Sequence, residues 1–266
     1  MYDSVIGMMS SSQILLSELR DGVLCLTLNR PKVNAFNFEL IAGLQSAFQR
    51  AEREAEVRCV LLSGAGDHFS AGQDLTEFRP DEQIPFRYHL QRTYNPLILQ
   101  MRRLEKPVLA AVNGAVSGAA LGVALACDLR IASDQARFVV GFAGIGLAPD
   151  SAVSLLLPAL ISLGRAAEFT FSNAPISAEQ VLTWGLVNRV VPASSLAGEA
   201  LRWAAQLARG PLHAMGLAKR AFNHAVLGDL ERVLDYEAYL QEIAGRSPEH
   251  KEGVSAFRQK RDPRFD

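Results

Sequence analysis

The chain has 266 residues, of which 49% are hydrophobic, and its 27 basic residues almost balance 28 acidic ones. The apolar fraction is enough for a sizeable core and excludes a disordered or low-complexity chain. A net charge of −1 leaves no basic excess to follow a phosphate backbone, so we expect no nucleic-acid partner. The length allows one large domain or two small ones.

The cysteines and histidines do not indicate a metal or disulfide site. Three cysteines are too few and too scattered for a disulfide framework or a zinc cluster, and five histidines show no metal-ligand spacing. We expect the cysteines to be small buried hydrophobes of a protein in a reducing cytoplasm. Residues 1–12 lack the basic and apolar regions of a signal peptide, which agrees with a cytoplasmic location.

The first half of the chain alternates strand and helix signals. Residues 14–19 and 23–28 are predicted strands, and the Asp21-Gly22 pair between them is typical of a hairpin turn. Asn37 is expected to cap a helix that has apolar residues at helical spacing. A strand at 59–62, a loop at 64–72 and a helix at 86–104 follow, and Pro96 is expected to kink or restart that helix.

An uncharged run from Pro107 to Cys127 is long enough to span a bilayer. However, Asn113-Gly114 and Ser117-Gly118 interrupt it, and it lacks flanking anchors, so we expect no membrane partner. The run is predicted instead to form a strand at 108–112, a glycine-rich loop and a buried helix at 118–126. Further strands are predicted at 129–132 and 138–140.

Helices are predicted to dominate after residue 151, and helices alone are expected in the last quarter. They are expected at 164–171, 177–184, 196–209, 211–226, 230–245 and from 247 or 248 to 259. This order predicts an α/β fold with a helical appendage. Arg209-Gly210-Pro211 is the expected boundary between a core of residues 1–210 and a helical region of residues 211–266.

Common nucleophile and nucleotide motifs are absent from the sequence, because no G-x-S-x-G or phosphate-loop pattern occurs, and residues 141–146 do not fit a dinucleotide motif. Two small-residue loops at 69–75 and 113–120 are more informative. Free backbone N–H groups in such loops can converge on an anionic oxygen and form an oxyanion hole. Alternatively, their glycines merely allow tight packing of strand on helix.

The segment 109–114 (LAAVNG), followed by 118–120 (GAA) and 125–129 (LACDL), resembles the signature of the enoyl-CoA hydratase/isomerase (crotonase) superfamily. Residues 28–31 (LNRP) and 34–37 (NAFN) resemble its first substrate-binding segment. The resemblance runs from about Ile14 to Phe265. It implies a ClpP/crotonase-like spiral of ββα units with a C-terminal helical trimerisation region, and assembly into a homotrimer or hexamer.

Three segments are most similar to superfamily members that isomerise ring epoxides of phenylacetyl-CoA during phenylacetate catabolism. They are 70–75 (SAGQDL), 146–150 (GLAPD), and 245–247 (GRS) with 252–257 (EGVSAF). The resemblance implies an acyl-CoA thioester substrate whose enolate oxygen is held by the backbone N–H groups of Gln73 and Ala119. The substrate-binding residues that it implies are Ala35, Ala71, Gly72, Asp74, Leu75, Gly118, Gly122, Phe142, Leu147, Phe257 and Lys260.

Two catalytic glutamates of family hydratases are missing, because their matching positions are Gly122 and Phe142. The remaining candidate is Asp150, a lone carboxylate between Phe138 and Gly164, whose apolar surroundings would raise its pKa as a general base needs. Superfamily isomerases and a dehalogenase carry an aspartate at this position, which implies a catalytic role. The alternative is that Asp150 caps the following helix.

The sequence and the resemblance together favour an isomerase in which Asp150 deprotonates a bound thioester. The expected substrate is an epoxide of phenylacetyl-CoA or a 3-enoyl-CoA, and no separate cofactor is expected because coenzyme A is part of the substrate. Hydration or thioester hydrolysis within the same superfamily is the enzymatic alternative. A catalytically degenerate acyl-CoA-binding subunit is the non-enzymatic alternative.

Overall fold

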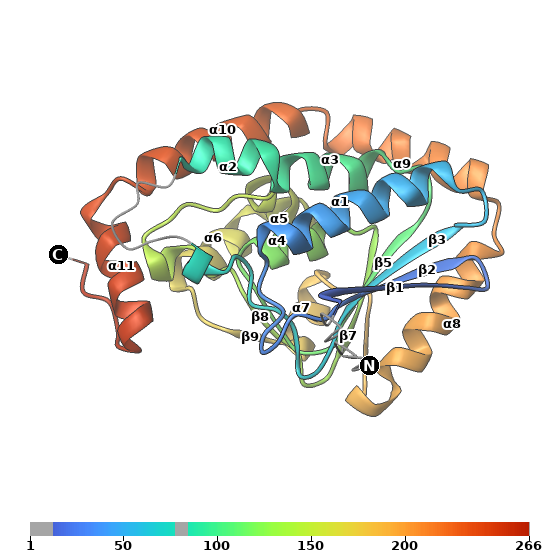
Figure 1. Cartoon of the computed structure of the whole chain (residues 1–266), viewed down its shortest axis with the longest axis horizontal. Coiled ribbons are helices and arrows are strands. Elements are labelled where there is room, and N and C mark those ends of the chain that lie inside the picture. Colours follow the sequence, from blue (N-terminus) through green and yellow to red (C-terminus); the bar gives the residue numbers. More distant parts are fainter. Residues whose placement is uncertain (1–12, 78–84, 266) are drawn as a thin grey trace, which may run out of the picture.

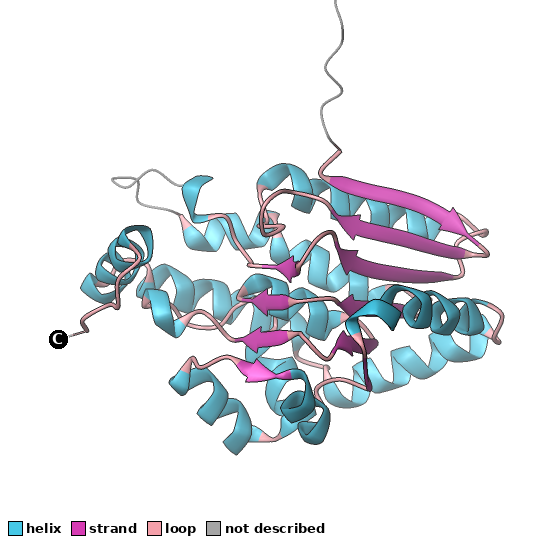
Figure 2. Cartoon of the chain, turned by 90° about the horizontal axis from the view of Figure 1, so that it is seen from below, coloured by secondary structure: helices cyan, strands magenta, loops and turns pink. Residues whose placement is uncertain are grey.

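A computed structural model describes residues 13–77 and 85–265 of the chain. Its larger sheet has the strand order β1-β2-β3-β5-β7-β10 (Figure 2). Strand β1 is antiparallel to β2, and every other neighbouring pair in this sheet is parallel. The strands are β1 (Leu15–Arg20), β2 (Val23–Leu28), β3 (Cys59–Gly64), β5 (Val108–Val112), β7 (Leu129–Ser133) and β10 (Arg189–Val191).

A smaller sheet has the order β4-β6-β8-β9 and is formed by β4 (His68–Ser70), β6 (Ala115–Ser117), β8 (Arg137–Val139) and β9 (Ile176–Ser177). The chain runs from β3 to β4, from β5 to β6 and from β7 to β8, so that it repeatedly crosses from the larger sheet to the smaller one. This repeated crossing is the predicted spiral, and it places the loops that follow the second-sheet strands beside one another.

Helices pack on both faces of the larger sheet and around the end of the spiral (Figure 1). They are α1 (Phe38–Arg53), α2 (Phe86–Arg92), α3 (Tyr94–Arg103), α4 (Ala119–Ala126), α5 (Val153–Ile161), α6 (Leu163–Ser172), α7 (Ala178–Trp184), α8 (Leu196–Ala208), α9 (Leu212–Val226), α10 (Leu230–Ala244) and α11 (Pro248–Gln259). Short 3-10 turns are η1 (Leu75–Glu77), η2 (Ala143–Ile145) and η3 (Ala193–Ser195).

The alternation of side chains along the strands divides the core in two. Leu24 and Leu26 of β2 lie in the main core with α1, α3, α4 and α5, whereas Val23 lies in a second cluster. That second cluster is covered by α8, which lies on the opposite face of the sheet from α1 (Figure 1). Successive strand residues point to opposite faces, so β2, β3 and β5 are buried on both faces, whereas β1 at the edge is largely exposed.

Several predicted boundaries are confirmed. Asn37 caps α1, because its side chain accepts a hydrogen bond from the Leu40 amide at 2.9 Å. The predicted helix 86–104 is interrupted, but at Thr93, three residues before Pro96. Pro96 therefore lies in the first turn of α3, where its missing N–H removes no helical hydrogen bond.

Four short strands depart from the sequence-based expectations. Strands β4 and β6 lie inside the segments 64–72 and 113–120 that we expected to be loops, and β9 and β10 lie in a part of the chain expected to be dominated by helices. Each has only two or three residues, which is too short to show a hydrophobic period. They form because the spiral supplies a neighbouring strand for their backbone groups.

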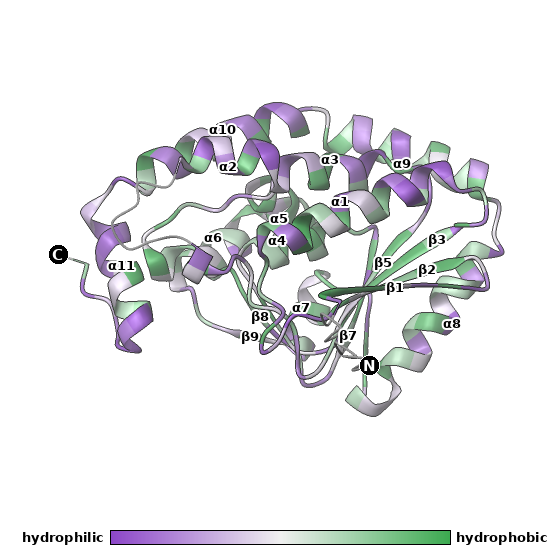
Figure 3. Ribbon diagram, viewed as in Figure 1, coloured by the Kyte–Doolittle hydropathy of each residue, from purple (hydrophilic) through white to green (hydrophobic). Residues whose placement is uncertain are grey.

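The expected helical region beyond Pro211 consists of α9, α10 and α11. Helix α10 packs against α2, α3 and α5, and α11 packs against η2 (Figure 1). Hydrophilic and hydrophobic residues alternate along α10 (Figure 3). In the described parts of the chain, no helix combines the length and the apolar character needed to cross a bilayer. The uncharged run from Pro107 forms β5, β6 and α4 instead.

Candidate active site

The two small-residue loops meet at Gly72. This residue has a φ of +84°, and a methyl group at its position would lie 2.6 Å from the Ser117 carbonyl oxygen and 3.4 Å from the Ala119 nitrogen. Both the left-handed backbone and the close approach require glycine. The geometry therefore brings the peptide before Gln73 against the amino end of α4.

The backbone amide of Gln73 faces away from its neighbouring strand. The Phe36 amide donates to the Gly72 carbonyl at 2.7 Å, and the Asp74 amide donates to the Phe36 carbonyl at 2.8 Å. In this parallel pattern the intervening Gln73 N–H points to the opposite side. Ala119 is the first residue of α4, where amides have no helical acceptor.

Within residues 13–77 and 85–265, neither the Gln73 nor the Ala119 amide makes a hydrogen bond. Two free amides on touching loops can hold one anionic oxygen. The amino end of α4 adds a favourable dipole for negative charge. The arrangement therefore has the chemical features that an oxyanion hole needs.

The Gln73 side chain is held by a buried cluster. Its Oε1 accepts from the Tyr94 hydroxyl at 2.7 Å and lies 3.1 Å from His89 Nε2, while its Nε2 lies 3.2 Å from a Glu77 carboxylate oxygen. A carbonyl oxygen only accepts, so His89 Nε2 carries the hydrogen. Burial lowers the pKa of His89 to about 4, so that the ring is neutral at physiological pH. The sequence analysis did not identify His89 or Tyr94.

Asp150 is buried, with 6% of its surface exposed, in the segment between η2 and α5. The Ser151 hydroxyl donates to Oδ1 and the Gln241 carboxamide Nε2 donates to Oδ2, both at 2.7 Å. Burial raises the pKa of Asp150 to about 6, although both hydrogen bonds act in the opposite direction. A carboxylate with this pKa is suited to accept and return a proton near neutral pH.

Tyr94 binds the Gln73 side chain, and the charge of Asp150 affects its pKa. Burial, followed by the charges of Asp150 and Glu77, raises the pKa of the Tyr94 hydroxyl well above its ordinary value. The same hydroxyl donates to Gln73. Asp150 and the side chain that anchors the Gln73 loop therefore belong to one electrostatic environment.

The capping interpretation of Asp150 is wrong. A capping side chain accepts from an amide two or three residues later, whereas the Asp150 carboxylate accepts from Ser151 and Gln241 side chains. The amino end of α5 is instead capped by Glu237 of α10, which accepts from the Ala152 amide at 2.8 Å and from the Ser154 amide at 3.0 Å. Glu237 also accepts from the Ser154 hydroxyl.

The Asp150 segment packs closely against α4 at Gly122. A methyl group at Gly122 would lie 2.5 Å from both Cβ and the carbonyl oxygen of Ser151, so no larger residue fits while that backbone stays in place. Ser151 and Ala152 have left-handed φ values of 56° and 64°, which turn the chain sharply against α4. The glutamate that the family resemblance implies for hydratases at this position therefore has no space here.

Phe142 and Leu147 lie in one segment, in which the Leu147 amide donates to the Phe142 carbonyl at 3.0 Å. Phe142 is buried and follows Gly141, where a methyl group would lie 2.4 Å from Ser117 Oγ. This contact places the segment against the loop that precedes Gly118. Leu147 is partly buried and packs against the main core. Both side chains are apolar and can shape a pocket, but neither can exchange a proton.

Asp74 and Ala35 stabilise the loop that supplies Gln73. Asp74 forms an ion pair with Arg30 at 2.6 Å, and its other oxygen accepts from the Thr76 amide and hydroxyl. Burial opposes these contacts, but together they hold the pKa of Asp74 below its ordinary value. Arg30 also donates to the Ala35 carbonyl. In the described residues, Asp74 is thus a structural anion.

Phe257 and Lys260 lie at the end of α11. Arg258 of this helix donates to the Leu75 carbonyl at 3.3 Å. This hydrogen bond places the end of α11 beside η1, which begins two residues after Gln73. Phe257 is 61% exposed and Lys260 is also exposed. Ala71, also exposed, donates its amide to the Val33 carbonyl. No contact between these residues and Asp150 is found in the structure described.

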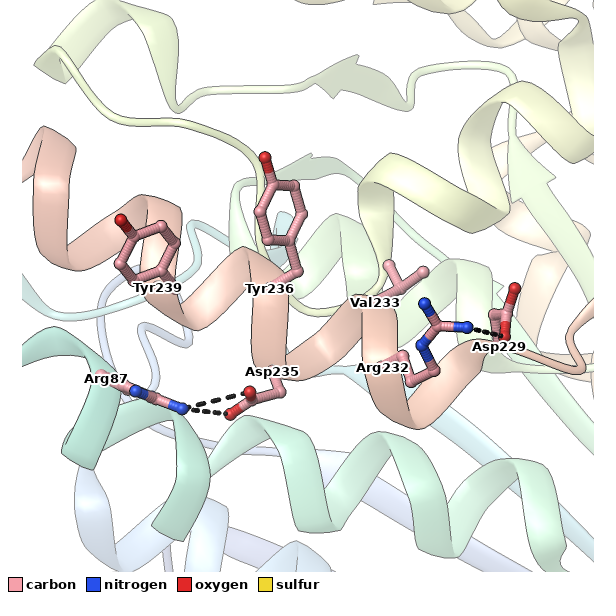
Figure 4. Close-up of a pocket in the computed structure, with 7 residues that line it drawn as sticks. All are labelled: Arg87, Asp229, Arg232, Val233, Asp235, Tyr236 and Tyr239. Carbon is pink, nitrogen blue, oxygen red and sulfur yellow. Dashed lines mark hydrogen bonds and ion pairs between the residues drawn. The ribbon is translucent and has the colours of Figure 1, made fainter.

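A hollow between α2 and α10 is separate from these groups (Figure 4). It contains none of the candidate residues, and it is lined by Arg87, Asp229, Arg232, Val233, Asp235, Tyr236 and Tyr239. Figure 4 shows Arg87 of α2 reaching Asp235 of α10, and the ion pair measures 3.0 Å. Across the described ranges, no group of three histidine, cysteine or acidic side chains is arranged to hold a metal ion.

Comparisons with known proteins agree with this architecture. Residues 18–266 match the family model described as enoyl-CoA hydratase/isomerase. The chain is 41% identical to 1,2-epoxyphenylacetyl-CoA isomerase of Escherichia coli (strain K12), with 95% of this chain and 98% of that protein aligned. It is 38% identical to a Rhodobacter capsulatus protein named as a probable enoyl-CoA hydratase, with 93% of this chain and 96% of that protein aligned.

A solved structure also matches closely. An enoyl-CoA hydratase from Mycobacterium avium subsp. paratuberculosis superposes with a TM-score of 0.87 and is 34% identical. The match covers 95% of this chain and 98% of that one.

Proposed function

This chain belongs to the enoyl-CoA hydratase/isomerase family, and from that membership we propose that it is an acyl-CoA isomerase with Asp150 as its base. The proposed substrates are CoA thioesters whose carbonyl lies next to an acidic C–H. The proposed products have the same composition and a moved double bond or C–O bond. The relative from Escherichia coli, named as an epoxyphenylacetyl-CoA isomerase, supports a ring epoxide of phenylacetyl-CoA as the first candidate.

The reaction begins when the thioester carbonyl oxygen accepts hydrogen bonds from the Gln73 and Ala119 amides. Asp150 removes the proton from the adjacent carbon, and the electron pair moves onto the carbonyl oxygen as an enolate. In mutagenesis of other enzymes, one such donor contributes roughly 3 to 4 kcal/mol to lowering the barrier. Because the donors are fixed before the charge develops, little reorganisation is needed.

The fate of the enolate depends on the acyl group. With a 3-enoyl thioester, the electron pair extends over the double bond, and protonated Asp150 returns its proton to C4 to give the 2-enoyl isomer. With a ring epoxide, the electron pair breaks the adjacent C–O bond and releases the oxygen as an alkoxide. The alkoxide adds to another carbon of the unsaturated ring conjugated with the thioester, and the enolate that this forms takes its proton back from Asp150. Neither route consumes water or releases coenzyme A.

The observation that carries this proposal is the buried Asp150 carboxylate, on a segment that packs against Gly122 of α4, the helix whose first amide belongs to Ala119. Asp150 has a pKa of about 6, and the positions of the two hydratase glutamates are occupied by Gly122 and Phe142. Adding water across a double bond needs groups that activate water and protonate carbon. An isomerase needs only one group that takes a proton and returns it.

Hydration is the second candidate, because several relatives carry hydratase names. Glu237 is the group that favours it. This second buried carboxylate has a pKa that burial raises to about 7, and the charge of Asp150 contributes to the rise. However, its oxygens already accept from Ala152 and Ser154, which leaves it poorly placed to activate water.

A panel of thioesters tests the proposal. Purified protein is given 1,2-epoxyphenylacetyl-CoA, a 3-enoyl-CoA and a 2-enoyl-CoA, and products are followed by mass and by release of free thiol. We expect an isomer of unchanged mass from one of the first two. A product heavier by one water would indicate a hydratase, and free coenzyme A a hydrolase. Binding without any conversion would indicate a degenerate acyl-CoA-binding subunit.

A further inference from the structure

A side-chain carboxamide of α10, that of Gln241, contacts Asp150. Gln241 of α10 follows Asp150 by 91 residues in the sequence and is fully buried. Its Nε2 donates a hydrogen bond to Asp150 Oδ2 at 2.7 Å. Hydrogen bonds to charged acceptors are the stronger ones in proteins. This contact joins the expected helical appendage directly to the proposed base.

The same carboxamide has no apparent structural reason to be polar. Its Oε1 is buried and lacks a hydrogen-bond partner in the described residues. A buried unpaired acceptor lowers stability, and an apolar side chain of similar volume would remove that cost. Leucine would also leave the buried Asp150 Oδ2 without its donor, so the bond to Asp150 is the contribution that distinguishes Gln241 from an apolar residue.

The Ser151 and Gln241 bonds together fix the carboxylate plane. Ser151 donates to one oxygen and Gln241 to the other, so rotation about the Cβ–Cγ bond would break both contacts. Each oxygen keeps a second lone pair that can accept a proton. Loss of the Gln241 donor would leave one oxygen unsupported and free the carboxylate to turn.

The titratable groups coupled to Asp150 are few. Glu237 precedes Gln241 by one turn of α10, and its pKa is raised by burial and by the charge of Asp150. Tyr94 of α3 is coupled to Asp150 in the same way. Helices α4 and α5, which pack around this segment, contain no charged residue. A change in the titration of Asp150 is thus attributable to a small set of neighbours.

We propose that Gln241 is a positioning residue for the reaction, which orients Asp150 through the Nε2–Oδ2 hydrogen bond and makes α10 part of the active site. The inference rests on the proposed role of Asp150 as the base. It goes beyond that role because it assigns a function to a residue outside the spiral core. It also predicts that loss of the bond changes the pH dependence of catalysis, which a merely structural contact would not affect.

The test compares Gln241→Leu and Gln241→Glu with the wild-type protein on the thioester that it converts. For Gln241→Leu we expect kcat to fall about tenfold to a hundredfold with KM nearly unchanged, because the base is misoriented. The acidic limb of the kcat/KM profile should move up by about one pH unit, because the lost bond favoured the carboxylate. Gln241→Glu places a second carboxyl group beside Asp150 and should move the acidic limb to a still higher pH.

Gln91→Leu is the matched control. Gln91 of α2 donates to Asp235 of α10 at 2.9 Å, so this variant also removes a glutamine–aspartate bond to the same helix, but on the exposed surface. Its kcat and pH profile should equal those of the wild type. Thermal melting of both variants is measured alongside, so that kinetics are compared only for protein that is folded at the assay temperature.

Three outcomes separate this inference from the proposed function. A wild-type kcat and pH profile in both Gln241 variants would overturn the inference, even if Asp150→Asn is inactive. An equal loss in Gln241→Leu and Gln91→Leu without a pH shift would also overturn it, because only the docking of α10 would then matter. Full activity in Asp150→Asn would instead remove the proposed base itself.

Discussion

At the scale of single residues, the raised pKa of Asp150 was predictable from the sequence, but its hydrogen-bond partners were not. Its isolation in an uncharged segment predicts a raised pKa, and burial does raise the pKa to about 6. The hydrogen bonds from Ser151 and Gln241 were not predicted. Gln241 lies 91 residues away, and nothing in a local pattern indicates which distant side chain meets a buried carboxylate.

The stability of the protein should depend on the ionisation of Asp150. Its pKa is about 6 when folded and ordinarily 3.8, so the folded chain holds this proton more tightly. Stability is therefore lost as the pH rises from about 4 to 6, by up to roughly 3 kcal/mol. Asp150→Asn removes this loss, so the free energy of unfolding of the variant should rise relative to that of the wild type between about pH 4 and 6. Urea unfolding at several pH values measures the difference, and a constant difference would contradict the assignment.

Tyr94 should matter for catalysis through Gln73. Tyr94→Phe removes a donor to Gln73 Oε1 while keeping the aromatic ring in the core. We expect turnover to fall by up to about tenfold, because one anchor of the oxyanion loop is lost. Tyr88→Phe is the control, since that exposed hydroxyl accepts from Arg92 of its own helix and has no other hydrogen bond among residues 13–77 and 85–265. Equal rates for the two variants would show that the anchor has no effect.

At the scale of elements, long periodic segments were predictable and short strands were not. Strands β4 and β6 lie at the positions that form the two loops, but each has three residues. The buried face of α10 is not defined by apolar residues alone. Leu230 and Leu234 indicate that face, but Glu237 and Gln241 share it, and two polar residues on an apolar stripe suggest a buried site.

Gly122 should tolerate no side chain. The clash with Ser151 predicts that Gly122→Ala destabilises the protein by about 1 to 3 kcal/mol and lowers activity, because the Asp150 segment must move. Gly164→Ala in α6 is the control, since no atom lies within 4 Å of the added methyl group. Urea unfolding and turnover of both variants test this. A Gly122→Ala protein with wild-type stability would contradict the close packing.

At the scale of the whole molecule, the family signature predicted the spiral fold, which composition alone could not specify. An apolar fraction of 49% and an alternating order of elements indicate only an α/β class. The crossings between the two sheets depend on contacts between distant strands. The boundary near Pro211 stays a prediction. Helix α10, which lies beyond that boundary, contacts Asp150 in the core.

Assembly is expected from the outer surface of the C-terminal helices. Apolar and aromatic residues of α9 and α10 are 43% to 67% exposed in the single chain, namely Leu217, Phe222, Val226, Tyr236, Tyr239 and Ile243. Exposed groups of this kind are typical of interaction surfaces. We expect a homotrimer or hexamer, which light scattering at micromolar concentration measures. A monomer mass would contradict this expectation.

The central claim is that Asp150 moves the proton, and Asp150→Asn tests it most directly. Asparagine keeps the size of the side chain and its capacity for hydrogen bonds but cannot serve as the base. In single-turnover reactions with the thioester that the wild type isomerises, we expect the rate to fall by roughly 10² to 10⁴ while ester binding is retained. An unchanged rate in a folded, ester-binding variant would contradict the account.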